Sequence, residues 1–214
     1  MKRLLLFAFL AVSATYANVI FYDTNGSVFN CSGGNVTGCG SNQIVIGGSI
    51  QLIYVPTLTS VTVDANTPTT NANFGYLQTS CVEGSACDWQ TLPSGIFLSL
   101  NVNQSQPESN SGLIPGGTLI GGGLSGLSSA SIISWGSNGF VVFSGPLAVV
   151  TYSLANTTFG IVPPASCDAG NANCGQTTIQ GTITDPPGSG IPEPAVSILV
   201  ASGMLMLGAA RRRK

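Results

Sequence analysis

The chain has 214 residues, of which 43% are hydrophobic and only 7% are charged, and its formal net charge is −2. It contains no histidine, and its six basic residues all lie within the first three or the last four positions. Residues 18–190 hold seven of the eight acidic residues and no cation, which gives this segment a formal charge of −7. Because recognition of phosphate and of anionic lipid depends on Lys and Arg, the composition excludes nucleic acid and anionic membrane surfaces as partners of this segment.

The N-terminus has the three parts of a secretory signal peptide. Two basic residues precede an apolar run at residues 4–12, and small residues follow up to Ala17. The apolar run is too short to span a membrane, whereas the small residues fit the positions that signal peptidase recognises. We therefore expect residues 1–17 to be a signal peptide and the mature chain to begin near Asn18.

The C-terminus carries a second apolar segment, at residues 195–210, between a proline-rich triplet and a basic cluster. The triplet is Pro192, Glu193 and Pro194, and the basic cluster is Arg211, Arg212, Arg213 and Lys214. As a transmembrane helix, the apolar segment would span about 24 Å, slightly less than the ~30 Å hydrocarbon core of a bilayer. The positive-inside rule places the basic cluster in the cytoplasm and the rest of the chain across the membrane.

This order of triplet, transmembrane helix and arginine cluster resembles the PEP-CTERM sorting domain of Gram-negative bacteria, over residues 192–214 alone. The resemblance implies that a membrane protease, exosortase, cuts near the triplet. The product would be an intermediate anchored in the inner membrane and then a protein of the cell surface or extracellular space. The resemblance also implies an association with producers of exopolysaccharide and biofilm. A plain anchor that is never cut is the alternative, since every single-span anchor needs an apolar run and a cationic stop.

Residues 18–184 have the pattern of one domain of short β-strands, followed by a Pro/Gly linker at residues 185–191. Apolar and polar residues alternate in runs that Gly, Asn, Ser or Pro separate, and no run predicts a helix of more than two turns. The expected strands cover residues 19–23, 43–46, 49–55, 57–64, 74–79, 95–102, 132–135, 140–144, 147–154, 157–162 and 177–184. These runs predict an all-β fold, an antiparallel β-sandwich of jelly-roll or immunoglobulin-like kind.

Local patterns give more detailed expectations. The Gly47-Gly48 link is typical of a two-residue β-hairpin, and Asn138-Gly139 predicts a second hairpin between the expected strands on either side of it. Residues 104–111 are expected to form a loop. Glycines interrupt the apolar residues at positions 116–126 so often that any strands there should be short or bulged.

All six cysteines lie in the body of the chain, and we expect disulfides because an exported chain reaches an oxidising compartment. They fall into three close pairs: Cys31 with Cys39, Cys81 with Cys87, and Cys167 with Cys174. Proximity and the turn-forming residues between partners favour these local pairs, although the sequence allows other connectivities. A zinc site is disfavoured, because no spacing is CxxC and the chain has no histidine.

Few residues of the body are suited to catalysis. Without histidine or lysine there is no general base of near-neutral pKa for a nucleophilic mechanism, and no P-loop is present. A carboxylate pair of the glycosidase type remains, with Glu83, Asp88 and Glu108 as candidates and Trp89 as a platform for a sugar ring. Two of these acids lie in or beside the second cysteine loop, where an acidic side chain is usually just solvated.

Carbohydrate binding needs aromatic rings and amides on a sheet face or rim. The candidates are Trp89, Trp135, Tyr54, Tyr76 and Tyr152, although Trp135 and Tyr152 also fit a buried core because they lie in apolar strands. Our first expectation is a non-enzymatic exported protein of the cell surface or extracellular matrix, with no cofactor and no catalytic or metal-binding residue. The alternatives are a carbohydrate-binding module of an exopolysaccharide matrix and, after it, a glycoside hydrolase.

Overall fold

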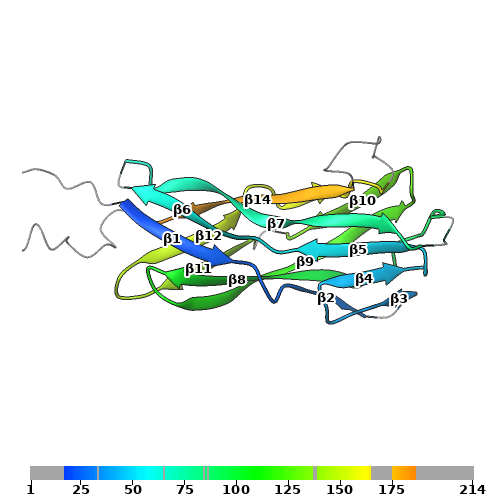
Figure 1. Ribbon diagram of the computed structural model, residues 1–214, viewed down its shortest axis with the longest axis horizontal. Coiled ribbons are helices and arrows are strands. Elements are labelled where there is room, and N and C mark those ends of the chain that lie inside the picture. Colours follow the sequence, from blue (N-terminus) through cyan, green and yellow to red (C-terminus); the bar gives the residue numbers. More distant parts are fainter. Residues whose placement is uncertain are drawn as a thin grey trace, which may run out of the picture.

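A computed structural model of the chain describes residues 17–32, 34–64, 66–83, 85, 87–136, 139–164 and 175–186. These residues form fourteen β-strands, all paired antiparallel, in two sheets that pack face to face (Figure 1). The predicted all-β antiparallel sandwich is therefore confirmed. No described segment is a helix with the length and apolarity needed to cross a membrane. Residues 1–16, the sorting motif and the predicted transmembrane helix at 195–210 lie outside the described residues.

Sheet A contains seven strands. In spatial order they are β13 (Thr158–Gly160), β10 (Ser129–Ser134), β9 (Asn110–Leu124), β8 (Ile96–Gln106), β1 (Ala17–Asp23) and β6 (Leu58–Asp64), and β2 (Val28–Cys31) also pairs with β8. Strand β1 pairs with the C-terminal half of β8 and β2 with its N-terminal half. The two strands therefore cover one edge of β8 in succession.

Sheet B also contains seven strands. In spatial order they are β11 (Phe140–Ser144), β12 (Val149–Leu154), β14 (Gln176–Thr184), β7 (Thr69–Cys81), β5 (Ile50–Val55), β4 (Gln43–Ile46) and β3 (Val36–Thr37). The predicted hairpin at Gly47-Gly48 joins β4 to β5 and is confirmed, although its loop between the paired Ile46 and Ile50 has three residues, Gly47 to Ser49, where the sequence predicted two. Both glycines have positive φ, 59° and 70°, as a type I′ turn requires.

Alternate side chains of each strand form the core between the sheets. In β8, Ile96, Leu98, Leu100 and Val102 are fully buried, each with an exposed fraction of 0%. The side chains between them are only half-buried and belong to the outer face of sheet A. This is the alternation that the sequence predicts for residues 95–102.

Aromatic side chains from both sheets meet in this core. Tyr22 of β1 packs on Phe74 of β7 and on Tyr152 of β12, with ring centroids 6.0 and 5.6 Å apart. Phe143 of β11 contacts the same Tyr152 ring at 5.3 Å. The edge-on and tilted geometry of these pairs is the one that aromatic rings favour.

Three buried tyrosine hydroxyls form hydrogen bonds between one sheet and residues of the other. Tyr22 donates to the backbone oxygen of Asn73 at 2.8 Å, and Tyr152 donates to Oε1 of Gln104 at 2.8 Å. The Tyr54 hydroxyl is hydrogen-bonded to Oγ1 of Thr24 at 2.7 Å and also donates to the backbone oxygen of Phe74, in its own sheet, at 2.5 Å. Thr24 lies in the connection from β1 to β2, and the other acceptors lie in β7 and β8. Each hydroxyl is therefore satisfied inside an apolar interface, where an unpaired hydroxyl would be costly.

The predicted loop at residues 104–111 was wrong, because β8 and β9 extend through most of it. Gln104, which is polar, has an exposed fraction of only 4%, since it accepts the Tyr152 hydroxyl and donates to the backbone oxygen of Glu108. At 116–126 the sequence predicted strands that are short or bulged, and the strand there is long and bulged. Strand β9 runs to Leu124 with a register shift opposite Leu98/Leu100, so the expected bulging is confirmed.

The hairpin predicted from Asn138-Gly139 was wrong, since β10 and β11 belong to different sheets. Strand β10 already has β9 on one side and β13 on the other, which leaves it no free edge for β11. Strand β11 instead pairs with β12 in sheet B, where Phe143 faces the core. The chain therefore crosses the sandwich at the point where the sequence predicted a tight turn.

We predict that Gly181→Ala destabilises the fold by about 1–3 kcal/mol, because the added methyl has no space. An ideal Cβ at Gly181 would lie 2.2 Å from Cε2 of Phe74 and 2.2 Å from the backbone oxygen of Ser153. The control is Gly160→Ala in β13, where nothing lies within 4 Å of the ideal Cβ. It should change the free energy of unfolding, measured with urea, by less than about 0.5 kcal/mol. Equal effects of the two substitutions would contradict this account of the packing.

Candidate functional site

The structure divides the five predicted carbohydrate-contacting aromatic residues into two groups. Trp135, Tyr54 and Tyr152 are core side chains, with exposed fractions of 5%, 1% and 0%. Trp89 is 48% exposed and lies against Gly123 of β9, whose ideal Cβ would be 2.7 Å from the indole. Tyr76 is half-buried on the outer face of sheet B. Only Trp89 and Tyr76 are therefore available to a ligand, and they lie on different surfaces.

The outer face of β7 and β14 is an uncharged surface of hydroxyl and amide side chains, which we call the amide face. It consists of Thr69, Asn71, Asn73, Tyr76 and Gln78 of β7 and Thr178, Gln180, Thr182 and Thr184 of β14. The strand register places Thr178 opposite Tyr76 and Gln180 opposite Asn73. The face therefore offers neutral donors and acceptors beside one aromatic ring.

A bulge in β7 brings Tyr76 onto the amide face. Phe74 and Gly75 are both buried, so the alternation shifts by one residue, and Asn73 and Tyr76 point to the same side. Gly75 has φ of 96°, and its N–H donates to Oδ1 of Asn73 at 2.8 Å. An ideal Cβ at Gly75 would lie 2.4 Å from the backbone oxygen of Val55, so only glycine fits this position.

A shallow depression of about 360 Å³ lies on the amide face, where both strands change register. It is lined by Asn71, Ala72, Asn73, Ala155, Thr178, Gln180 and Gly181. Within the described residues, the side chains of Asn71, Thr178 and Gln180 have no hydrogen-bond partner in the structure. They are therefore available to a ligand that carries hydroxyl groups.

The three candidate catalytic acids do not come together as a set. Glu83 and Asp88 are exposed in and beside the second cysteine loop, and Cys87 of that loop accepts the N–H of Gly126, beyond the end of β9. Glu108 precedes the start of β9, and its Oε1 accepts the N–H of Leu147. The full length of β9 thus separates Glu108 from the other two, whereas the carboxyl groups of a glycosidase lie within about 10 Å of each other.

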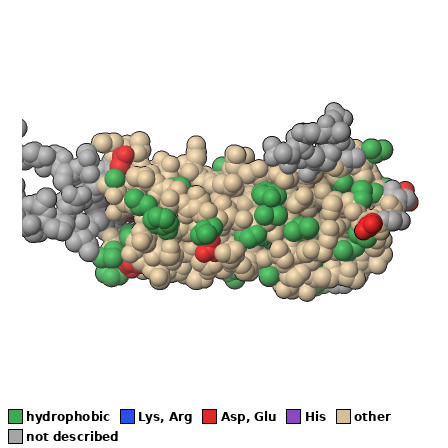
Figure 2. Space-filling model, in the orientation of Figure 1, with side chains coloured by type: hydrophobic (Ala, Val, Ile, Leu, Met, Phe, Trp, Pro, Cys, Tyr) green, Lys and Arg blue, Asp and Glu red, His purple; other side chains and the backbone are tan. Residues whose placement is uncertain are grey.

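Four carboxylates of the described residues, those of Asp23, Asp64, Glu108 and Asp185, accept hydrogen bonds from amide N–H groups, and no described residue carries a basic side chain. Oδ1 of Asp23 accepts from the N–H of Asn25 at 2.8 Å and from Nδ2 of Asn103 at 2.9 Å. Hydrogen bonds from the backbone N–H groups of Thr67 and Asn66 lower the pKa of Asp64. In Figure 2 the visible face shows acidic side chains as scattered groups and no basic side chain among the described residues.

The first and last strands of the domain meet at one end of the sandwich. Nδ2 of Asn18, at the start of β1, donates to Oδ2 of Asp185, after β14, at 2.5 Å. The N–H of Asp185 donates to the backbone oxygen of Pro68 at 2.9 Å. The chain therefore enters and leaves the domain at the same end (Figure 1).

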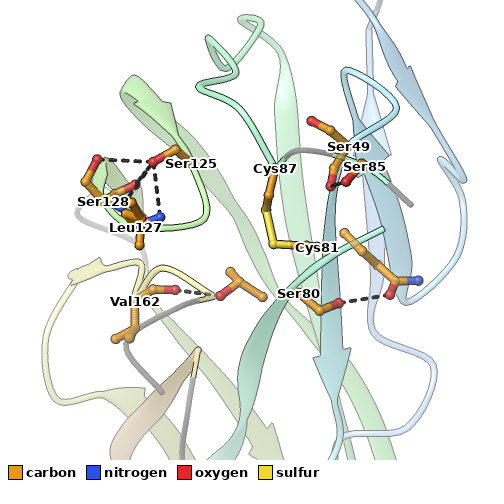
Figure 3. The surroundings of a disulfide bond; sticks show 11 residues. Ser49, Ser80, Cys81, Ser85, Cys87, Ser125, Leu127, Ser128 and Val162 are labelled. Atoms are coloured by element: carbon orange, nitrogen blue, oxygen red, sulfur yellow. Dashed lines mark hydrogen bonds between the residues drawn. A yellow bond between two sulfur atoms is a disulfide. The ribbon is translucent and has the colours of Figure 1, made fainter. Parts of the chain in front are cut away.

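Two of the three predicted cysteine pairs are disulfides in the structure. Cys31–Cys39 joins the end of β2, in sheet A, to the segment after β3, in sheet B. Cys81–Cys87 holds the loop after β7, whose Ser85 Oγ donates to the backbone oxygen of Ser49 at 3.1 Å (Figure 3). Cys167 and Cys174 lie outside the described residues.

The second disulfide loop closes one end of the sandwich between the two sheets. On one side it contacts Ser49, in the turn before β5 of sheet B. On the other side the backbone oxygen of Cys87 accepts the N–H of Gly126 at 2.8 Å, in the turn between β9 and β10 of sheet A. Figure 3 shows Cys87 between the Ser125–Ser128 turn and Ser49. The described disulfides thus lie where the chain passes between sheets.

No group of three His, Cys, Asp or Glu side chains that could hold a metal ion occurs among the described residues. The predicted sorting residues Pro192, Glu193, Pro194, Arg211, Arg212 and Arg213 lie outside them. The chain matches no protein-family model, no curated protein and no solved structure.

Burial raises the pKa of three core tyrosines. The pKa of Tyr22 rises to about 12. The pKa values of Tyr54 and Tyr152 are also raised by burial. In the unfolded chain the same phenols ionise near pH 10. At alkaline pH the unfolded state therefore loses protons that the folded state keeps.

We predict that the free energy of unfolding falls as the pH rises above about 10, by about 1.4 kcal/mol per pH unit for each of these tyrosines. Below about pH 9 both states keep the phenol protons, so this contribution does not change there. Urea unfolding at a series of pH values measures the slope. Tyr22→Phe should make the dependence of the free energy of unfolding on pH less steep by the contribution of one tyrosine. An unchanged dependence would contradict the claim that Tyr22 contributes to it.

Proposed function

We propose that this protein is a non-enzymatic exported protein of the cell surface or extracellular matrix. The observation that carries the proposal is the placement of every cation in the two terminal segments, outside a body that is acidic and disulfide-bonded. Disulfides persist in oxidising compartments and are rare in the cytosol, so the two in the body support export. The signal peptide at residues 1–17 would direct export, and signal peptidase would remove it.

The C-terminal segment 192–214 is proposed to direct sorting through an exosortase-type protease. Residues 195–210 would hold the chain in the inner membrane, with Arg211 to Arg213 in the cytoplasm, until cleavage near Pro192 releases the body. The meeting of Asn18 and Asp185 supports this scheme, because both targeting segments then attach to one end of the domain. The linker at 185–191 would separate this end from the membrane.

Carbohydrate binding is a second candidate function, favoured by the amide face. Neutral hydroxyl and amide side chains beside an aromatic ring suit a neutral polysaccharide, because they exchange hydrogen bonds with sugar hydroxyls without burying charge. Sandwiches of jelly-roll or immunoglobulin-like kind, as we propose this one to be, include lectin domains. The ligand would be an uncharged polysaccharide of the matrix, bound at the depression between β7 and β14.

We predict that intact-mass spectrometry of the protein from its native producer gives a chain that starts near Asn18 and ends near Pro192. Replacing Pro192, Glu193 and Pro194 together by Ala should leave the tail attached, because the extended cleavage segment is lost. Ser189→Ala, in the linker, is the control and should be processed like the wild type. A native chain that is intact through Lys214 would support a permanent anchor instead.

We predict that a glycan array shows binding of neutral oligosaccharides by the exported protein, and that Asn71→Ala and Gln180→Ala each lower the affinity about 2- to 10-fold. Each substitution removes a hydrogen bond worth about 0.5–1.5 kcal/mol. Tyr76→Ala should reduce binding further through the loss of the ring. Ser60→Ala, on the outer face of sheet A, is the control. Loss of binding in Trp89→Ala but not in Tyr76→Ala would move the site to the second cysteine loop.

A further inference from the structure

Strand β11 (Phe140–Ser144) is an edge strand of sheet B, and its one strand partner within the described residues is β12. Two hydrogen bonds that flank this strand pair show which backbone groups of β11 face β12. The N–H of Leu154 donates to the oxygen of Gly139 at 2.8 Å, and the N–H of Gly145 donates to the oxygen of Ala148 at 3.0 Å. Antiparallel pairs alternate, so Val141 and Phe143 also bond to β12.

By the same alternation, the N–H and C=O groups of Phe140, Val142 and Ser144 point away from sheet B. No hydrogen bond to these groups from another described residue is present in the structure. A row of unpaired backbone groups is a template for another β-strand, because only an extended chain matches its spacing. The partner that fits this edge is therefore a strand.

The outer face beside this edge carries exposed apolar side chains among Ser144, Thr151 and Ser153. Phe140 and Val142 are 48% and 44% exposed, and Val149 of β12 is 37% exposed. Neither β11 nor β12 contains a charged residue, a proline or a register shift. Native edge strands are usually protected by one of these features, so the edge at β11 is open to pairing.

The other edges of the two sheets are less suited to pairing. Strands β3 and β13 have only 2 and 3 residues. Strand β6 has 7 residues, but it follows Pro56 and ends at Asp64. Pairing of β6 with a second copy of itself would bring the carboxylates toward the partner strand, whereas β11 carries none.

We propose that β11 is a self-association surface, at which two copies of this chain pair antiparallel about a two-fold axis at Val142. In this register Phe140 lies opposite Ser144 of the second copy, and Val142 lies opposite its own equivalent. The outward N–H and C=O groups of all three residues then pair across the axis. Phe140, Val142 and Val149 of both copies form one continuous apolar strip.

The charge distribution favours a second copy at this edge. Two bodies of the same negative charge repel each other, and the cost is smallest where the contact itself is uncharged. The exposed strip is such a place, because β11 and β12 carry no charge. A single strand pair buries little area compared with a stable dimer interface, so the association should be weak and concentration-dependent.

Sedimentation velocity of the exported protein over a concentration series tests the proposal, with detergent present if the tail remains attached. We expect a monomer–dimer equilibrium for the wild type. Val142→Lys should raise the dimer dissociation constant at least roughly 100-fold, because the dimer contains the substitution twice and two ammonium groups then face each other at the edge. Thr62→Lys on β6 is the matched control and should associate like the wild type.

Amide hydrogen exchange gives a second readout at the level of single residues. The N–H groups of Phe140, Val142 and Ser144 should become protected as the protein concentration rises, whereas those of Val141 and Phe143 are protected throughout by β12. Three results would each overturn the proposal: a wild type that stays monomeric, a Val142→Lys variant that dimerises like the wild type, or a Thr62→Lys variant whose dimer is weakened as much as that of Val142→Lys. Unfolding curves of the variants show whether the monomer fold is kept.

Discussion

Three tyrosine hydroxyls hold the two sheets in one relative position. Apolar contacts between sheets have little directionality, whereas the hydroxyls of Tyr22, Tyr54 and Tyr152 each form a directional hydrogen bond with one residue of the opposite sheet or its connections. The acceptor Gln104 also donates to the backbone of Glu108, so the core network extends to the β8–β9 turn. Sliding one sheet on the other would leave these buried groups unpaired, which costs more than the bonds gain.

The absence of basic side chains shapes the surface around this core. No described residue offers a carboxylate a basic side chain, and Asp23, Asp64 and Asp185 accept hydrogen bonds from backbone or asparagine N–H groups. These bonds bind the acids to turns and to the domain ends. The broad outer face of β7 and β14 is left neutral, with amides and hydroxyls in place of charges.

Patterns within short stretches of sequence correctly predicted the features that depend on residues close together in the chain. The alternation at 95–102 identified the buried side of β8, and proximity identified the pairs Cys31–Cys39 and Cys81–Cys87. Sheet membership depends on distant strands, so the sequence at Asn138-Gly139 did not reveal that β10 already had two partners. For the candidate site, the alternation of Thr178 and Gln180 was visible. The bulge at Gly75 hid the fact that Asn73 and Tyr76 share that face.

The meeting of Asn18 and Asp185 at one end of the domain gives the sandwich a polarity along its strands. Antiparallel pairing reverses strand direction, so two copies joined at β11 would present these ends in opposite directions. Neighbours embedded side by side in one bilayer could not adopt that geometry. Copies on facing surfaces, or copies already freed from the lipid, could adopt it.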